Sequence, residues 1–158
     1  MGAPATLLRC AVAALCVLHL GAGAAPSTFG PVVGSALLCR SALENRYMQG
    51  YLMTAFGPAY KHEGGAFWFK VDVKLWGAQV TDVLISDERS AIVFVAAVIE
   101  AAPARLEESI RSLAGVAHRP VDRSATPVRE SAPGSKIVYF NTRSKIFCAK
   151  YKHLPLEP

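Results

Sequence analysis

The chain has 158 residues, of which 52% are hydrophobic, and a formal net charge of +5. A chain of this length is expected to build one small domain around a single core. Its positive residues are scattered and form no basic stripe with interleaved aromatic residues, which argues against nucleic-acid binding. Lysines alternate with apolar residues over 145–152, but this is the ordinary pattern of a strand with one side facing solvent. An acidic partner or an anionic lipid surface suits the mild positive charge better.

Residues 1–24 are predicted to form a cleavable secretory signal peptide. Arg9 precedes an apolar run, Cys10–Leu20, and small residues follow it with the A-x-A spacing at Ala22 and Ala24. A spanning helix needs roughly 20 apolar residues, so this run is short for a membrane anchor, although an uncleaved anchor stays as the alternative. We expect cleavage after Ala24, or secondarily after Ala25. No stable transmembrane anchor would then remain, and the protein would be periplasmic or secreted.

Loss of the signal peptide changes both the charge and the cysteine count. Arg9 is its only charged residue, so the net charge falls from +5 to +4, and four cysteines become two, Cys39 and Cys148. In an oxidising compartment two cysteines in a small domain usually pair. The closed loop of about a hundred residues would contribute roughly 4–5 kcal/mol in the chain-entropy description. Two buried free thiols are the alternative, and the absence of a C-x-x-C motif disfavours a redox role.

The mature chain is predicted to begin with a short lead-in, 25–34, and one helix over 35–56. Apolar residues recur there every three or four positions, and Gly57-Pro58 ends the pattern. Tyr47, Tyr51 and Phe56 lie on the apolar side of this helix. They could line a pocket for a small apolar ligand between the helix and a sheet.

Three strands are predicted next. After a polar connection, 61–65, the segment 67–76 alternates apolar residues with charged residues and tryptophans, which indicates a strand with one buried face. Segments 79–86 and 91–100 are the second and third strands, joined by a polar loop at 87–90. The third strand is apolar on both faces, which predicts a central place in the sheet.

A second helix is predicted from Pro103 to Leu113, because proline suits a first helical position and Gly115 follows the last apolar residue. Residues 116–134 contain three prolines and no periodicity, so they are predicted to be a loop. Strands over 135–140 and 145–151 complete the domain, 35–152, and residues 153–158 are a proline-rich tail. The predicted fold is α+β: helix, three antiparallel strands, helix, two strands, with both helices on one face of a roughly five-stranded sheet.

No complete catalytic set is present, so we expect no catalytic residues, no metal and no cofactor. His62-Glu63 resembles the start of a zinc-binding H-E-x-x-H helix, but the second histidine position holds Ala66. A small hydrolase that uses His62, Glu63 and Asp72 is the least favoured function, because the sequence does not bring these groups together.

A pair of tryptophans gives the strongest indication of function. By alternation Trp68 and Trp76 share a strand face with Lys70, Asp72 and Lys74, opposite the apolar side. Aromatic residues bordered by charges are typical of interaction sites. We therefore expect a non-enzymatic exported domain that binds another envelope or secreted macromolecule, as an inhibitor, an immunity-type protein or an accessory subunit does. Alternatively, Trp76 turns inward and the 116–134 loop covers Trp68. The sequence pattern specifies neither the partner nor the oligomeric state.

Overall fold

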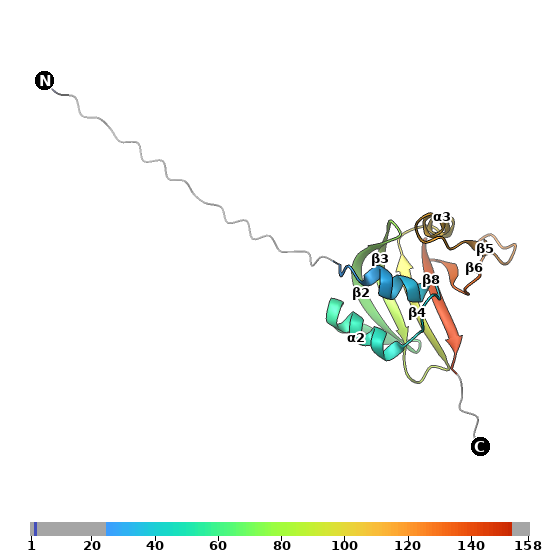
Figure 1. Cartoon of the computed structure of the whole chain (residues 1–158), viewed down its shortest axis with the longest axis horizontal. Coiled ribbons are helices and arrows are strands. Elements are labelled where there is room, and N and C mark those ends of the chain that lie inside the picture. The colour runs from blue at the N-terminus through green and yellow to red at the C-terminus, as the bar shows by residue number, and fades with distance from the viewer. Residues whose placement is uncertain (1, 3–24, 153–158) are drawn as a thin grey trace, which may run out of the picture.

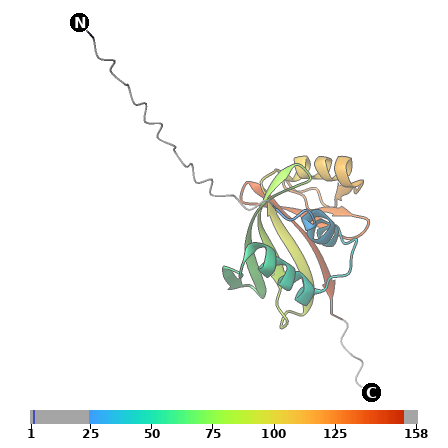
Figure 2. The same ribbon diagram turned by 60° about the vertical axis from the view of Figure 1, so that its left-hand side comes forward.

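The structure is a computed structural model that describes residues 25–152, together with Gly2. The rest of the predicted signal peptide and the tail from His153 lie outside the described residues. One antiparallel eight-stranded sheet has the order β1-β2-β3-β4-β8-β7-β6-β5, and helices cover one of its faces (Figures 1 and 2). In chain order the elements are η1 (Gly30–Gly34), α1 (Ser35–Leu37), α2 (Asn45–Phe56), β1 (Lys61–Glu63), β2 (Ala66–Leu75), β3 (Ala78–Ser86), β4 (Ile92–Ile99), α3 (Pro103–Ala114), β5 (His118–Pro120), β6 (Arg129–Ser131), β7 (Lys136–Phe140) and β8 (Arg143–Tyr151).

The fold is α+β, but the predicted five-stranded sheet is wrong. The predicted polar connection at 61–65 contains β1, which turns into β2 through Gly64 and Gly65, both with positive φ. The predicted loop at 116–134 contains β5 and β6. Each of the three added strands has three residues, and β1 and β5 are the two edges of the sheet. A strand of three residues is too short to show an alternation of apolar and polar residues, so its sequence resembles that of a loop.

The single helix predicted over 35–56 is also wrong. The wide helical turn η1 continues directly into α1. The helix ends before Leu38 and Cys39, and α2 begins only at Asn45. Apolar periodicity continues through the break because both helical segments bury a side against the same sheet. The predicted lead-in belongs to this packing as well, since Phe29 and Val33 are buried in the core.

The main core lies between the helices and one face of the sheet. β2 contributes every second residue, as its alternation predicts: Phe69, Val71, Val73 and Leu75 are buried there. From the helices, Leu52 of α2 and Ile110 of α3 are fully buried against the same layer. We call this side of the sheet the covered face. As predicted, β4 is central, between β3 and β8.

A disulfide joins Cys39 to Cys148, which confirms the predicted pairing. Cys39 lies at the break after α1, with a φ of 56°, and Cys148 is fully buried on the covered face of β8. The bond therefore ties the first helical layer to a central strand, across 109 residues of chain. A disulfide is compatible with an oxidising compartment. Within residues 25–152, no helix is long and apolar enough to cross a membrane.

Candidate functional site

The opposite face of the sheet carries no helix in Figures 1 and 2, and we call it the open face. Trp68 pairs with Leu84, Leu84 pairs with Ala96, and Ala96 pairs with Phe147, so the four residues form a row across β2, β3, β4 and β8. Directly paired residues share a sheet face. Leu84 and Ala96 are buried, whereas Trp68 and Phe147 are only partly buried. A second, thinner apolar cluster therefore lies under the aromatic rings of the open face.

This cluster has a shallow groove at its surface, with a volume of about 300 Å³. Its walls come mainly from β2, β3, β4 and β8, and Glu63 and Gly64 of the β1–β2 turn form one end. The lining residues are Glu63, Gly64, Ala66, Trp68, Leu84, Ile92, Phe94, Ala96, Lys145, Phe147 and Ala149. We call this feature the Trp68 groove. Most of its lining side chains are apolar, so an apolar group placed in the groove would remove apolar surface from water.

Two lysines approach the Trp68 ring from different strands. Lys61 of β1 is the direct cross-strand partner of Trp68, and its Nζ lies 4.5 Å from the ring centroid. Lys145 of β8 places Nζ 5.3 Å from the Trp68 centroid and 4.1 Å from that of Phe140. These are cation–π distances. Burial, together with the positive charge of Lys61, lowers the pKa of Lys145 below its ordinary value.

Lys70 belongs to a polar cluster beside the groove. Its Nζ lies 2.9 Å from Asp82 Oδ1, and the same carboxylate accepts hydrogen bonds from Tyr60 Oη at 2.8 Å and Thr81 Oγ1 at 2.7 Å. Burial of Asp82 favours its neutral form, but these hydrogen bonds outweigh it and hold the Asp82 pKa below its ordinary value. Burial and the bond to Asp82 raise the pKa of Tyr60 to about 12. Lys70 is thus already neutralised by a neighbour.

The other members of the predicted binding surface separate from Trp68. Asp72 is exposed within an irregularity of the β2–β3 register and Lys74 is exposed beyond it, and Asp72 accepts a hydrogen bond from Gln79. Trp76 does not share the face of Trp68. It lies in the β2–β3 turn with a φ of 49°, and its side chain packs against the main core beside Gly34. Strand alternation ends where the turn begins, so it does not fix the direction of Trp76.

The three residues predicted to line a ligand pocket do not surround one common cavity in the described part of the chain. Tyr47 is exposed beside a hollow formed with Pro31 and Val32. Phe56 packs edge-to-face on Phe29, and Tyr51 contacts the core with its hydroxyl 3.1 Å from Thr28 Oγ1. Two of the three residues, Tyr51 and Phe56, thus pack against the core instead of lining a pocket, and Tyr47 faces outward.

His62 and Asp87 form a second polar site at the same edge of the sheet, on the side of Phe67 and not of Trp68. His62 Nε2 lies 2.9 Å from Asp87 Oδ2, and the imidazole stacks on Phe67 at 4.3 Å. Asp87 Oδ1 accepts the backbone N–H groups of Arg89 and Ser90. The bond from His62 and these two amides lower the pKa of Asp87. The hollow around the pair has a volume of about 440 Å³ and shares Glu63 and Gly64 with the Trp68 groove.

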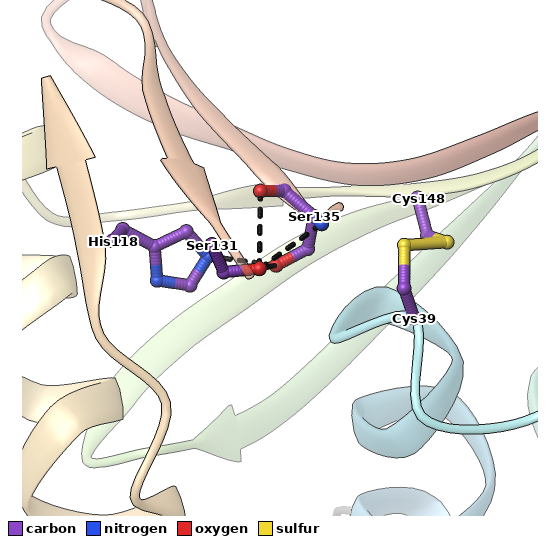
Figure 3. Close-up of a disulfide and its surroundings, with 5 residues drawn as sticks. All are labelled: Cys39, His118, Ser131, Ser135 and Cys148. Carbon is purple, nitrogen blue, oxygen red and sulfur yellow. Dashed lines mark hydrogen bonds between the residues drawn. A yellow bond between two sulfur atoms is a disulfide. The ribbon is translucent and has the colours of Figure 1, made fainter. Parts of the chain in front are cut away.

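A buried polar cluster supports the strands at the other end of the sheet. Ser135 Oγ lies 2.7 Å from His118 Nε2 and 2.8 Å from Ser131 Oγ, close to the disulfide (Figure 3). Burial lowers the pKa of His118, although the charge of Glu107 opposes this shift. His118 and Ser135 are fully buried, so no substrate can reach them. The cluster joins β5 and the β6–β7 turn and is structural.

Among residues 25–152, no group of three or more histidine, cysteine, aspartate or glutamate side chains is arranged to hold a metal ion. Glu63 and Asp72 are not assembled as a carboxylate pair, because Asp72 bonds to Gln79 while Glu63 pairs with Lys61. Comparison with protein-family models, curated proteins and solved structures found no match to this chain. Its function is therefore inferred from the geometry of its own residues.

Sequence reasoning identified Trp68 but missed its neighbours on the other strands. Lys61, Phe94, Phe140, Lys145 and Phe147 complete the surface around it. One signal was available in the sequence. Because β4 is apolar on both faces, side chains were expected to cover its second face as well. The solvent-facing pattern assigned to 145–152 concealed Lys145 and Phe147, because alternation shows that residues share a face and not what lies beside them.

Proposed function

We propose that this protein is a small exported, non-enzymatic domain that binds another protein of the envelope or medium through the Trp68 groove. The observation that carries the proposal is the partly buried Trp68 ring between Lys61 and Lys145, above an apolar floor. Tryptophan in an apolar depression with polar groups at its rim is the composition of an interaction hot spot. The disulfide supports export because such bonds persist in oxidising compartments.

The test is a pull-down from envelope extract and culture medium with the disulfide-intact protein. Trp68→Ser removes the ring from the groove, and Tyr139→Ser is the matched control. Tyr139 is exposed and lies two residues from Ile137 of the covered face, so it does not belong to the groove. We expect one stoichiometric partner with the original protein and with Tyr139→Ser, and none with folded Trp68→Ser. A partner retained by Trp68→Ser would exclude this surface.

Trp76 is unsuitable as a second mutation in this test. Its side chain packs against the main core, so replacement by serine would destabilise the fold and confound a loss of binding. A role for Trp76 in partner binding therefore has less support than a role for Trp68. The small-ligand carrier also has less support, because Tyr51 and Phe56 pack into the core.

A second candidate function, general-base hydrolysis, is favoured by the His62–Asp87 pair. A carboxylate that orients an imidazole beside an open hollow is the geometry of a general base. The test is turnover of p-nitrophenyl acetate and octanoate by the original protein and by His62→Gln. Hydrolysis above background that disappears in His62→Gln would support this function, and equal rates in both would end it.

A further inference from the structure

Lys145 differs from other lysines of the sheet in the groups that surround its ammonium. Lys70 pairs with Asp82 and Lys136 pairs with Glu130. Within the part of the chain that the structure describes, no carboxylate lies at ion-pair distance from Lys145, whose Nζ lies over aromatic rings. The Trp68 groove thus has a cation at its rim that the described residues do not neutralise.

The only acid lining the groove in residues 25–152 is Glu63, and it does not neutralise this cation. Glu63 pairs with Lys61, and its side chain is 67% exposed. Exposed ion pairs are weak and easily exchanged. Lys61, Lys145 and Glu63 together leave one positive charge at the rim.

An anion bound beside Lys61 and Lys145 would stabilise the charged form of Lys145. Burial and the like charge of Lys61 both lower the Lys145 pKa. A carboxylate near both lysines would oppose the repulsion between them and supply a charged hydrogen-bond partner. Electrostatic complementarity therefore favours a negatively charged group on the binding partner.

The floor of the groove specifies what should accompany the charge. Leu84 and Ala96 are buried below Trp68, Phe94 and Phe147, and the hollow has a volume of about 300 Å³. This is at the small end of ligand sites, which span about 300–1,000 Å³. It has room for apolar side chains rather than for a folded element.

Resting on the function proposed above, we propose that the protein partner presents an acidic residue next to an apolar residue, with the carboxylate at Lys61 and Lys145 and the apolar side chain in the Trp68 groove. A membrane surface fits less well. Lipid-binding surfaces cluster about four to eight basic residues, whereas here exposed Asp72 and Glu63 lie among the lysines.

The test is selection of random 12-residue peptides displayed on phage against the purified, disulfide-intact protein. We expect the selected sequences to share Asp or Glu beside Leu, Phe or Trp. A synthetic peptide with the leading sequence should bind Lys145→Gln at least tenfold more weakly than the original protein. Lys150→Gln, which makes the same charge change on the other face of β8, should bind normally, because Lys150 follows the covered-face alternation of Cys148.

The outcomes separate this inference from the function on which it rests. Selected peptides without acidic residues, or equal affinity for Lys145→Gln, overturn the acidic partner but leave the groove as the site if Trp68→Ser abolishes binding. Peptides that bind Trp68→Ser unchanged overturn the proposed function. If no peptide is selected, the inference fails, and Trp68-dependent binding to phosphatidylglycerol vesicles would then assign the groove to a membrane surface.

Discussion

The two faces of the sheet are built from the same strands but differ in what covers them. On the covered face, helices and sheet bury large aliphatic and aromatic side chains, and the disulfide fastens the first helical segment to β8. On the open face, Ala66, Leu84, Ala96 and Val98 are buried without a helix above them. Their cover is the sheet's own aromatic rings and lysine stems, since long charged side chains can lie along apolar surface with the charge in water.

The difference shows how one sheet can separate stability from recognition. Side chains alternate between faces along each strand, so Phe69 enters the core while its neighbour Trp68 faces the groove. A covered face tolerates little change because its volume is filled. An open face can carry a partly exposed tryptophan at small cost, which leaves it available for a partner. Four measurements test this separation.

The largest effect is expected from removal of the disulfide on the covered face. The double variant Cys39→Ala/Cys148→Ala should lose up to about 4–5 kcal/mol of unfolding free energy, because the bond closes a long loop of the unfolded chain. Urea denaturation measures the loss. Dithiothreitol should destabilise the original protein similarly and leave the double variant unchanged. A loss below about 1 kcal/mol would contradict a stabilising role for the bond.

The neighbouring residues Phe69 and Trp68 compare the two faces directly. Phe69 is 1% exposed, so Phe69→Ala should cost about 3–5 kcal/mol through lost burial and a cavity. Trp68→Ser should cost no more than about 2 kcal/mol, because the ring is only partly buried and its site can fill with water. Matched urea titrations of the two variants provide the comparison. Equal costs would mean that the open face is as important to stability as the covered one.

A pH effect of intermediate size is expected from His118. Its pKa in the folded protein is lowered by burial, so the unfolded chain takes up a proton first as the pH falls below about 6.5. Stability should then decrease with falling pH, by at most about 1.4 kcal/mol per pH unit for this group, until the folded protein is protonated too. The lowered pKa values of Asp82 and Asp87 reduce the unfolding free energy only below about pH 5, where the unfolded carboxyls begin to take up protons.

An NMR titration of the His118 ring checks this assignment, with unfolding free energies measured at pH 7.0, 6.0 and 5.5. A His118 resonance that titrates near the ordinary pKa of about 6.5 would contradict His118 as the cause of the pH-dependent loss of stability.

The smallest effect is expected from Lys145→Gln on the open face. Loss of the cation–π contacts costs about 0.5–1 kcal/mol, and removal of a desolvated charge next to Lys61 offsets part of it. The unfolding free energy should stay within about 1 kcal/mol of the original. A loss above about 2 kcal/mol would show that Lys145 supports the fold, and the binding test would then need Lys145→Met, which keeps an apolar stem and removes the charge.

The sequence by itself determined the features that depend on local periodicity or on residue type. Alternation in residues 67–76 identified β2 and its buried side, and a segment that is apolar on both faces placed β4 in the centre of the sheet. Pro103 and Gly115 mark the two ends of α3. Proline suits the first position of a helix, and glycine readily adopts the left-handed conformation that follows the last helical residue. Two cysteines in the predicted mature chain left one intramolecular pairing, Cys39 with Cys148.

Tertiary structure alone decided which distant residues meet. The short strands β1 and β6 are paired with the longer β2 and β7, and β5 is paired with β6, so tertiary pairing defines them and their own sequences carry little signal. Strand register brings Lys61, Phe140 and Lys145 to Trp68, while the β2–β3 turn directs Trp76 into the core. Periodicity reports the face of each residue within its own strand, but the composition of a site depends on register between strands, which long-range packing sets.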